Sequence, residues 1–186
     1  DVYKRQALDM LGGVERVHLS LSLGEIDLRT KIYMEALRCT GEVPSEELLL
    51  DTQFRLYRTR LSDCMNSLRE LVEGHFGQRM GRLSLLMPPP PSPALPGHLP
   101  ATINEAIHLI SITRYPRFGS HKSRLALWKS LCSMFEVAAK ENQLTFLSNS
   151  LYSQRQCLDM RWSNDGCHVD KGDAALLNSY IALRLR

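Results

Sequence analysis

The distribution of proline constrains this chain most strongly, because seven of its nine prolines fall between residues 88 and 100. Proline has no backbone N–H and fixes φ, so a dense run of prolines cannot continue a helix or occupy a central strand. The segment is predicted to be an extended, semi-rigid linker between an N-terminal half, residues 7–87, and a C-terminal half, residues 101–186. A polyproline ligand for an SH3-type domain is the alternative interpretation of the same composition.

The first six residues, Asp1 to Gln6, can be encoded by the end sequence of a transposase adapter used in DNA library preparation. Position 1 is also not a methionine. We therefore expect residues 1–6 to be adapter-derived and the natural sequence to enter near Ala7, as part of a longer open reading frame.

Composition indicates a globular protein, with 44% hydrophobic and 23% charged residues. The net charge of +3 is too small to indicate nucleic-acid or membrane binding unless the basic residues cluster. The five cysteines are odd in number and include no C-x-x-C pair, which favours reduced thiols and a cytoplasmic location. No apolar run approaches the roughly 18 residues of a membrane span, so no membrane association is expected.

The N-terminal half begins with an alternating apolar and polar stretch, Val17 to Leu23. This period of two predicts a half-buried strand, whose partner strand would lie in sequence missing from the N-terminus or in a partner subunit. A helix is expected over residues 25–38, with Thr40 and Gly41 ending it.

A second, longer helix is predicted from Ser45, a capping residue followed by two acids, to about Glu73. Its apolar residues recur in steps of four and three, which is typical of a helix that lays one stripe against a partner helix, within the domain or in a second copy. We predict that this interaction stripe consists of Leu50, Phe54, Tyr57, Leu61, Cys64, Leu68 and Leu71.

The C-terminal half is predicted to be helical throughout. The capping pair Thr102 and Glu105 starts a helix over residues 103–114, with the stripe Ile103, Ala106, Ile107 and Ile110. Further helices are expected over residues 122–141, 143–162 and 174–186; the first of these three would bury Leu127, Trp128, Leu131, Phe135 and Ala138.

The resulting fold class is mostly α: a helical bundle or hairpin arrangement with one short N-terminal β element and two helical subdomains joined by the proline-rich linker.

A basic and aromatic turn over residues 114–124 is the sharpest candidate binding site. Guanidinium groups, hydroxyls and free amides at a helix start suit phosphate, and exposed aromatic rings can stack on bases. The candidate phosphate- or nucleic-acid-binding residues are Arg114, Tyr115, Arg117, Phe118, Lys122 and Arg124. The alternative is a solvated turn whose aromatic rings pack inward.

A second polar cluster covers residues 164–173, with Cys157 upstream. Neither zinc nor calcium spacing is matched, so a polar turn is expected rather than a metal site, and no cofactor is expected. No nucleophile, phosphate-loop or metalloprotease motif is present either, which argues against an enzyme.

The sequence therefore favours a non-catalytic helical interaction or scaffold module that binds a protein partner or self-associates. The alternative is a nucleic-acid-binding or regulatory protein that contacts phosphates through residues 114–124.

Overall fold

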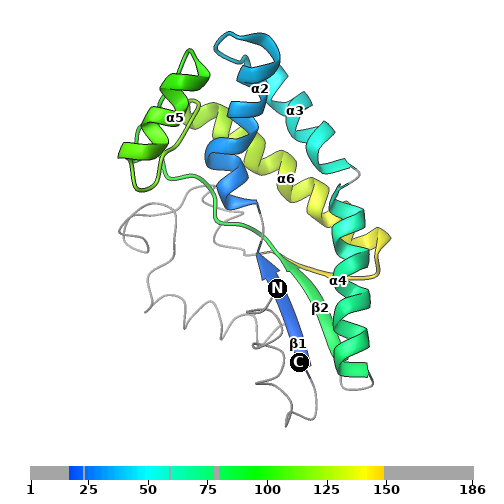
Figure 1. The fold of residues 1–186 in the computed structure, drawn as a ribbon. Coiled ribbons are helices and arrows are strands. Elements are labelled where there is room, and N and C mark those ends of the chain that lie inside the picture. Colours follow the sequence, from blue (N-terminus) through cyan, green and yellow to red (C-terminus); the bar gives the residue numbers. More distant parts are fainter. Residues whose placement is uncertain (1–16, 23, 59, 78–79, 149–186) are drawn as a thin grey trace.

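The computed structural model describes residues 17–22, 24–58, 60–77 and 80–148 (Figure 1). Within these residues the protein is mostly helical, as predicted. Three of the sequence predictions lie outside the described residues: the helix over 174–186, the 164–173 cluster with Cys157, and the adapter-derived residues 1–6. The elements in chain order are β1 (Val17–Ser22), the π-helix η1 (Asp27–Lys31), α2 (Ile32–Thr40), α3 (Glu46–Arg58), α4 (Arg60–Phe76), β2 (Met80–Leu86), α5 (Ile103–Ile112), α6 (His121–Glu141) and β3 (Thr145–Leu147).

The strands form a parallel three-stranded sheet with β2 in the centre, in the order β1-β2-β3. The predicted strand at Val17 is confirmed, and its partner β2 lies within the same chain rather than in missing sequence or another subunit. Two Leu-Ser-Leu triplets pair in register, with Ser20 opposite Ser84. Parallel neighbours need long crossovers, and here the crossovers are helical. The prediction of a single β element is therefore wrong.

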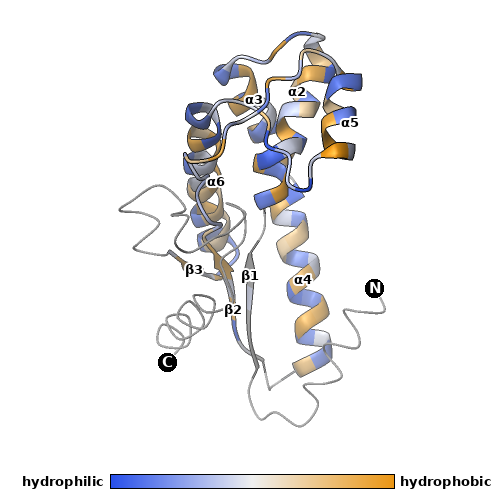
Figure 2. Cartoon of the chain, turned by 90° about the vertical axis from the view of Figure 1, so that its left-hand side faces the viewer, coloured by the Kyte–Doolittle hydropathy of each residue, from blue (hydrophilic) through white to orange (hydrophobic). Residues whose placement is uncertain are grey.

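The helices gather at one end of the sheet, with the exception of α4. Figure 1 and Figure 2 show α2, α3, α5 and α6 grouped beyond the ends of β1 and β2, while α4 runs alongside the sheet. The predicted continuous helix over residues 45–73 is instead the two helices α3 and α4, and the chain changes direction between them. This change lets α3 pack on α6 while α4 contacts β2.

One hydrophobic core takes residues from both halves of the chain. Helix α6 lies at its centre, and its predicted face is confirmed: Leu127, Trp128, Leu131, Phe135 and Ala138 are all buried. Among the described residues, this core therefore joins segments from both sides of the proline-rich segment.

The segment predicted to be an extended, semi-rigid linker forms hydrogen bonds with buried side chains of this core. The Trp128 indole N–H donates to the Pro88 carbonyl at 2.8 Å, and the Tyr33 hydroxyl donates to the Pro100 carbonyl at 3.1 Å. Its backbone carbonyls, which no proline ring blocks, thus accept hydrogen bonds from buried side chains.

Helix ends follow local sequence signals closely. The Thr102 hydroxyl accepts from the Glu105 N–H at 3.2 Å, and the Ser120 hydroxyl accepts from the Ser123 N–H at 3.0 Å. Gly41 ends α2 with a φ of 73°, a left-handed conformation that glycine adopts without strain. The expected helix over 143–162 is wrong at its start, where Thr145–Leu147 forms β3 against β2.

Candidate functional site

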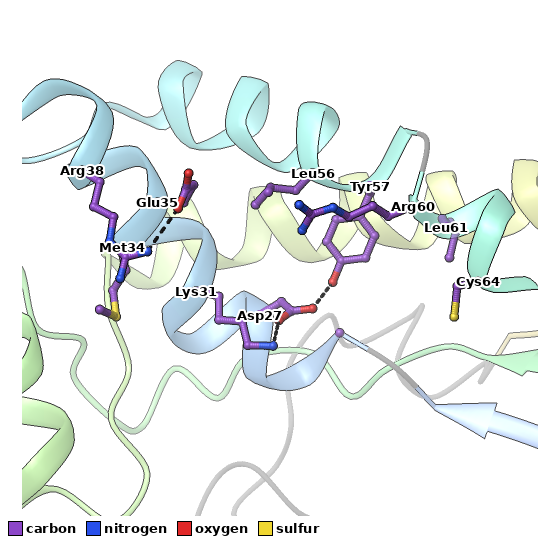
Figure 3. A pocket seen from close by; sticks show the side chains of 11 residues that line it. Asp27, Lys31, Met34, Glu35, Arg38, Leu56, Tyr57, Arg60, Leu61 and Cys64 are labelled. Atoms are coloured by element: carbon purple, nitrogen blue, oxygen red, sulfur yellow. Dashed lines mark hydrogen bonds and ion pairs between the residues drawn. The ribbon is translucent and has the colours of Figure 1, made fainter. Parts of the chain in front are cut away.

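A pocket with a volume of about 470 Å³ opens between two pairs of helices. Helices η1 and α2 form one side, and the end of α3 with the start of α4 forms the other (Figure 3). It is lined by Gly24, Asp27, Lys31, Met34, Glu35, Arg38, Leu56, Tyr57, Arg60, Leu61 and Cys64.

A hydrogen-bonded group of three side chains joins the two sides of the pocket. The Tyr57 hydroxyl on α3 donates to a carboxylate oxygen of Asp27 on η1, and the Lys31 ammonium lies 2.9 Å from the other oxygen. Burial, followed by this hydrogen bond, raises the pKa of Tyr57 well above its usual value of 10. The hydroxyl therefore stays protonated at neutral pH and fixes the position of the carboxylate.

Of the other charged side chains that line the pocket, two form an ion pair with each other and one does not. Glu35 pairs with Arg38 at 3.3 Å, so both carboxylates of the pocket have a cationic partner. Arg60 has no ion-pair partner among the residues that the structure describes. Its guanidinium group lies near Leu56 and the Tyr57 ring, which also line the pocket (Figure 3).

The predicted interaction stripe does not form the buried face of α3 and α4. Of its seven residues only Leu61 is buried, whereas Phe54 and Leu71 are about half exposed. Tyr57, Leu61 and Cys64 line the pocket instead, Cys64 with an exposed side chain, and Leu50 and Leu68 are half-buried. The buried residues are Leu49, Thr52 and Gln53 of α3 and Leu61, Met65, Val72 and Phe76 of α4.

Two residues of the basic-aromatic turn belong to the core. Phe118 is 1% exposed and packs on Tyr33, with ring centroids 5.7 Å apart. Arg124 is 3% exposed and donates to the Leu95 carbonyl at 3.2 Å. Neither side chain is placed to contact a nucleic acid.

The other four residues of the turn differ in exposure and in what they contact. Arg114 lies over the Tyr115 ring at 5.2 Å from its centroid, and Arg29 lies 5.6 Å from the same centroid. Lys122 is 3.6 Å from Glu46 on α3, and Arg117 is half-buried beside the proline segment. Two of the positive charges thus have contacts within the fold, Arg114 with an aromatic ring and Lys122 with a carboxylate.

Much of the apolar stripe predicted for helix α5 is exposed. Of its expected stripe only Ala106 is buried, while Ile107 is 52% and Ile110 41% exposed. The single charged residue of α5, Glu105, accepts a hydrogen bond from the Ala101 N–H at 2.8 Å. The stripe itself was visible in the sequence, but the pattern could not say how much of it a neighbouring element covers.

In the described part of the chain, no helix combines the length and apolar character needed to cross a bilayer. The same residues include no group of three or more His, Cys, Asp or Glu side chains arranged to hold a metal ion. Comparisons with protein-family models, curated proteins and solved structures found no match to this chain.

Proposed function

We propose that the protein is a non-catalytic helical interaction or scaffold module that self-associates through the exposed apolar face of α5. One observation supports this most directly: Ile107 and Ile110, on adjacent turns of one helix, remain about half exposed after the core is complete. Neighbouring exposed apolar side chains on one helix face indicate a protein contact more strongly than isolated exposed residues do.

A second copy of the chain suits this surface because the face carries almost no charge. Two α5 helices related by a two-fold axis would bring Ile107 of one copy near Ile110 of the other. Glu105 is the only charged side chain on the helix, so the pairing meets little electrostatic repulsion. Full burial of an isoleucine is worth roughly 1.5–3 kcal/mol, and about half of that is still available at these positions. Association is therefore expected to be weak and to depend on protein concentration.

Sedimentation velocity over a hundredfold range of protein concentration tests the proposal. The average mass should rise with concentration in the unchanged chain, and Ile107→Glu should hold it at the monomer value. His108→Glu is the matched control, because it adds the same charge to the next residue, which is exposed and polar. A monomer at every concentration, or equal effects of the two substitutions, would contradict self-association through this face.

The alternative of nucleic-acid binding through residues 114–124 has weaker support, since Phe118 and Arg124 are buried. It requires Arg114, Arg117 and Lys122 to bind phosphates without a contribution from the two buried side chains.

A further inference from the structure

The pocket between η1–α2 and α3–α4 combines an apolar lining with the positive charge of Arg60, which no carboxylate of the described residues pairs with. Met34, Leu56, Leu61 and Cys64 supply apolar or weakly polar surface. The Tyr57 ring adds to this surface, because its hydroxyl is turned to Asp27 (Figure 3). Gly24 keeps this region open, since a Cβ at this position would meet Leu131 Cδ2 at 2.5 Å and the Tyr57 hydroxyl at 3.3 Å.

The charged side chains that line the pocket indicate which charge a bound ligand should carry. Asp27 is held by Lys31 and Tyr57, and Glu35 is held by Arg38. Arg60 remains, and Figure 3 shows it beside Tyr57 and Leu56 rather than directed away from the pocket. A ligand with one negative charge would match Arg60, whereas a cation would be repelled by it.

We propose that this pocket binds a small amphipathic monoanion, a compact apolar body with a single carboxylate. The volume of about 470 Å³ lies within the roughly 300–1,000 Å³ of small-molecule sites, which are mostly apolar with few polar groups. The apolar body lies against Leu56, Leu61 and the Tyr57 ring, and the carboxylate pairs with the Arg60 guanidinium. A dianion fits less well, because Lys31 and Arg38 already have carboxylate partners. This site is separate from the α5 face and does not depend on self-association.

Calorimetric titration with three probes that share a ten-carbon chain tests the assigned charge: decanoate, decanol and decyltrimethylammonium. Decanoate should bind most tightly and the cation most weakly. Arg60→Met should weaken decanoate binding about fivefold, the upper range for a solvent-exposed ion pair. Arg58→Met is the matched control, because Arg58 lies over the Phe54 ring, 5.5 Å from its centroid, and does not line the pocket. Equal affinities for the three probes, or equal losses in the two variants, would overturn the proposal.

Thiol protection locates the ligand without any substitution. Cys64 lines the pocket, whereas Cys39 is exposed on α2 and does not line it. Saturating decanoate should slow the alkylation of Cys64 by iodoacetamide, measured by peptide mass spectrometry, and should leave the rate at Cys39 unchanged. Protection of neither thiol, or equal protection of both, would place decanoate elsewhere and overturn the site.

Discussion

Gly97 offers the sharpest test of how the proline-rich segment is held in the fold. A Cβ built on Gly97 would lie 1.9 Å from the carbonyl oxygen of Gly119, far inside contact distance. Backbone hydrogen bonds join the segment around residue 97 to the segment around residue 119. The His98 N–H donates to the Arg117 carbonyl at 2.7 Å, and the Gly119 N–H donates to the His98 carbonyl at 2.8 Å. Any side chain at residue 97 must push these two backbone segments apart.

The cost of Gly97→Ala follows from those two hydrogen bonds. Each contributes about 0.5–1.5 kcal/mol to stability, so losing both should lower the free energy of unfolding by about 2 kcal/mol. With a urea m-value of about 2 kcal/mol/M, the unfolding midpoint should fall by about 1 M.

Urea unfolding followed by circular dichroism measures this shift, with Gly74→Ala as the matched control. Gly74 lies within α4, and an added Cβ meets nothing within 4 Å. Alanine there should raise stability by about 0.5–1 kcal/mol, because glycine is the poorer helix former. A Gly97→Ala midpoint equal to or above that of the unchanged chain would refute the close packing of the proline segment.

Three further predictions concern buried polar groups. Trp128→Phe should destabilise the protein by about 1–3 kcal/mol in thermal unfolding, because the buried Pro88 carbonyl loses its donor. Burial and a hydrogen bond raise the pKa of Tyr57, so the folded state loses stability as the pH rises above about 10; Tyr57→Phe should flatten that decline in unfolding free energy. Burial raises the pKa of the Cys132 thiol to about 12, so mass spectrometry at about pH 8 should find Cys39 alkylated and Cys132 unmodified in the folded protein.

The sequence predicted best those elements whose signals are local. The cap at Thr102 and the repeating apolar face of α6 act within a few residues, so their pattern alone located both helices. Strand β2 was not predicted because the two consecutive leucines Leu85 and Leu86 interrupt the alternation of apolar and polar residues that indicates a strand. Its evidence lies in pairing with the similar Leu-Ser-Leu triplet of β1, a contact distant in sequence.

Errors at the candidate site arose where polar residues are buried. Gln53 is fully buried and donates to the Leu127 carbonyl at 2.9 Å, so α3 turns a partly polar face inward and leaves Phe54 half exposed. A hydrophobic pattern cannot predict that choice, because it assigns Gln53 to the surface. Arg124 was misplaced for the same reason: a carbonyl of the proline segment, at Leu95, provides its buried partner. The pocket was missed because its lining residues come from separate helices that only the tertiary fold brings together.

The parallel sheet also determines when the fold can be completed during synthesis. Each strand pairs with a segment about 60 residues further along the chain, Ser20 with Ser84 and Ser84 with Thr145. At ribosomal rates of roughly 5–20 residues per second, β1 leaves the ribosome several seconds before β2, and β2 several seconds before β3. The helices between them can form locally during those intervals, whereas the strands must wait with unpaired edges. The sheet therefore cannot be complete before β3 has emerged, and until then β2 presents an unpaired edge to other chains.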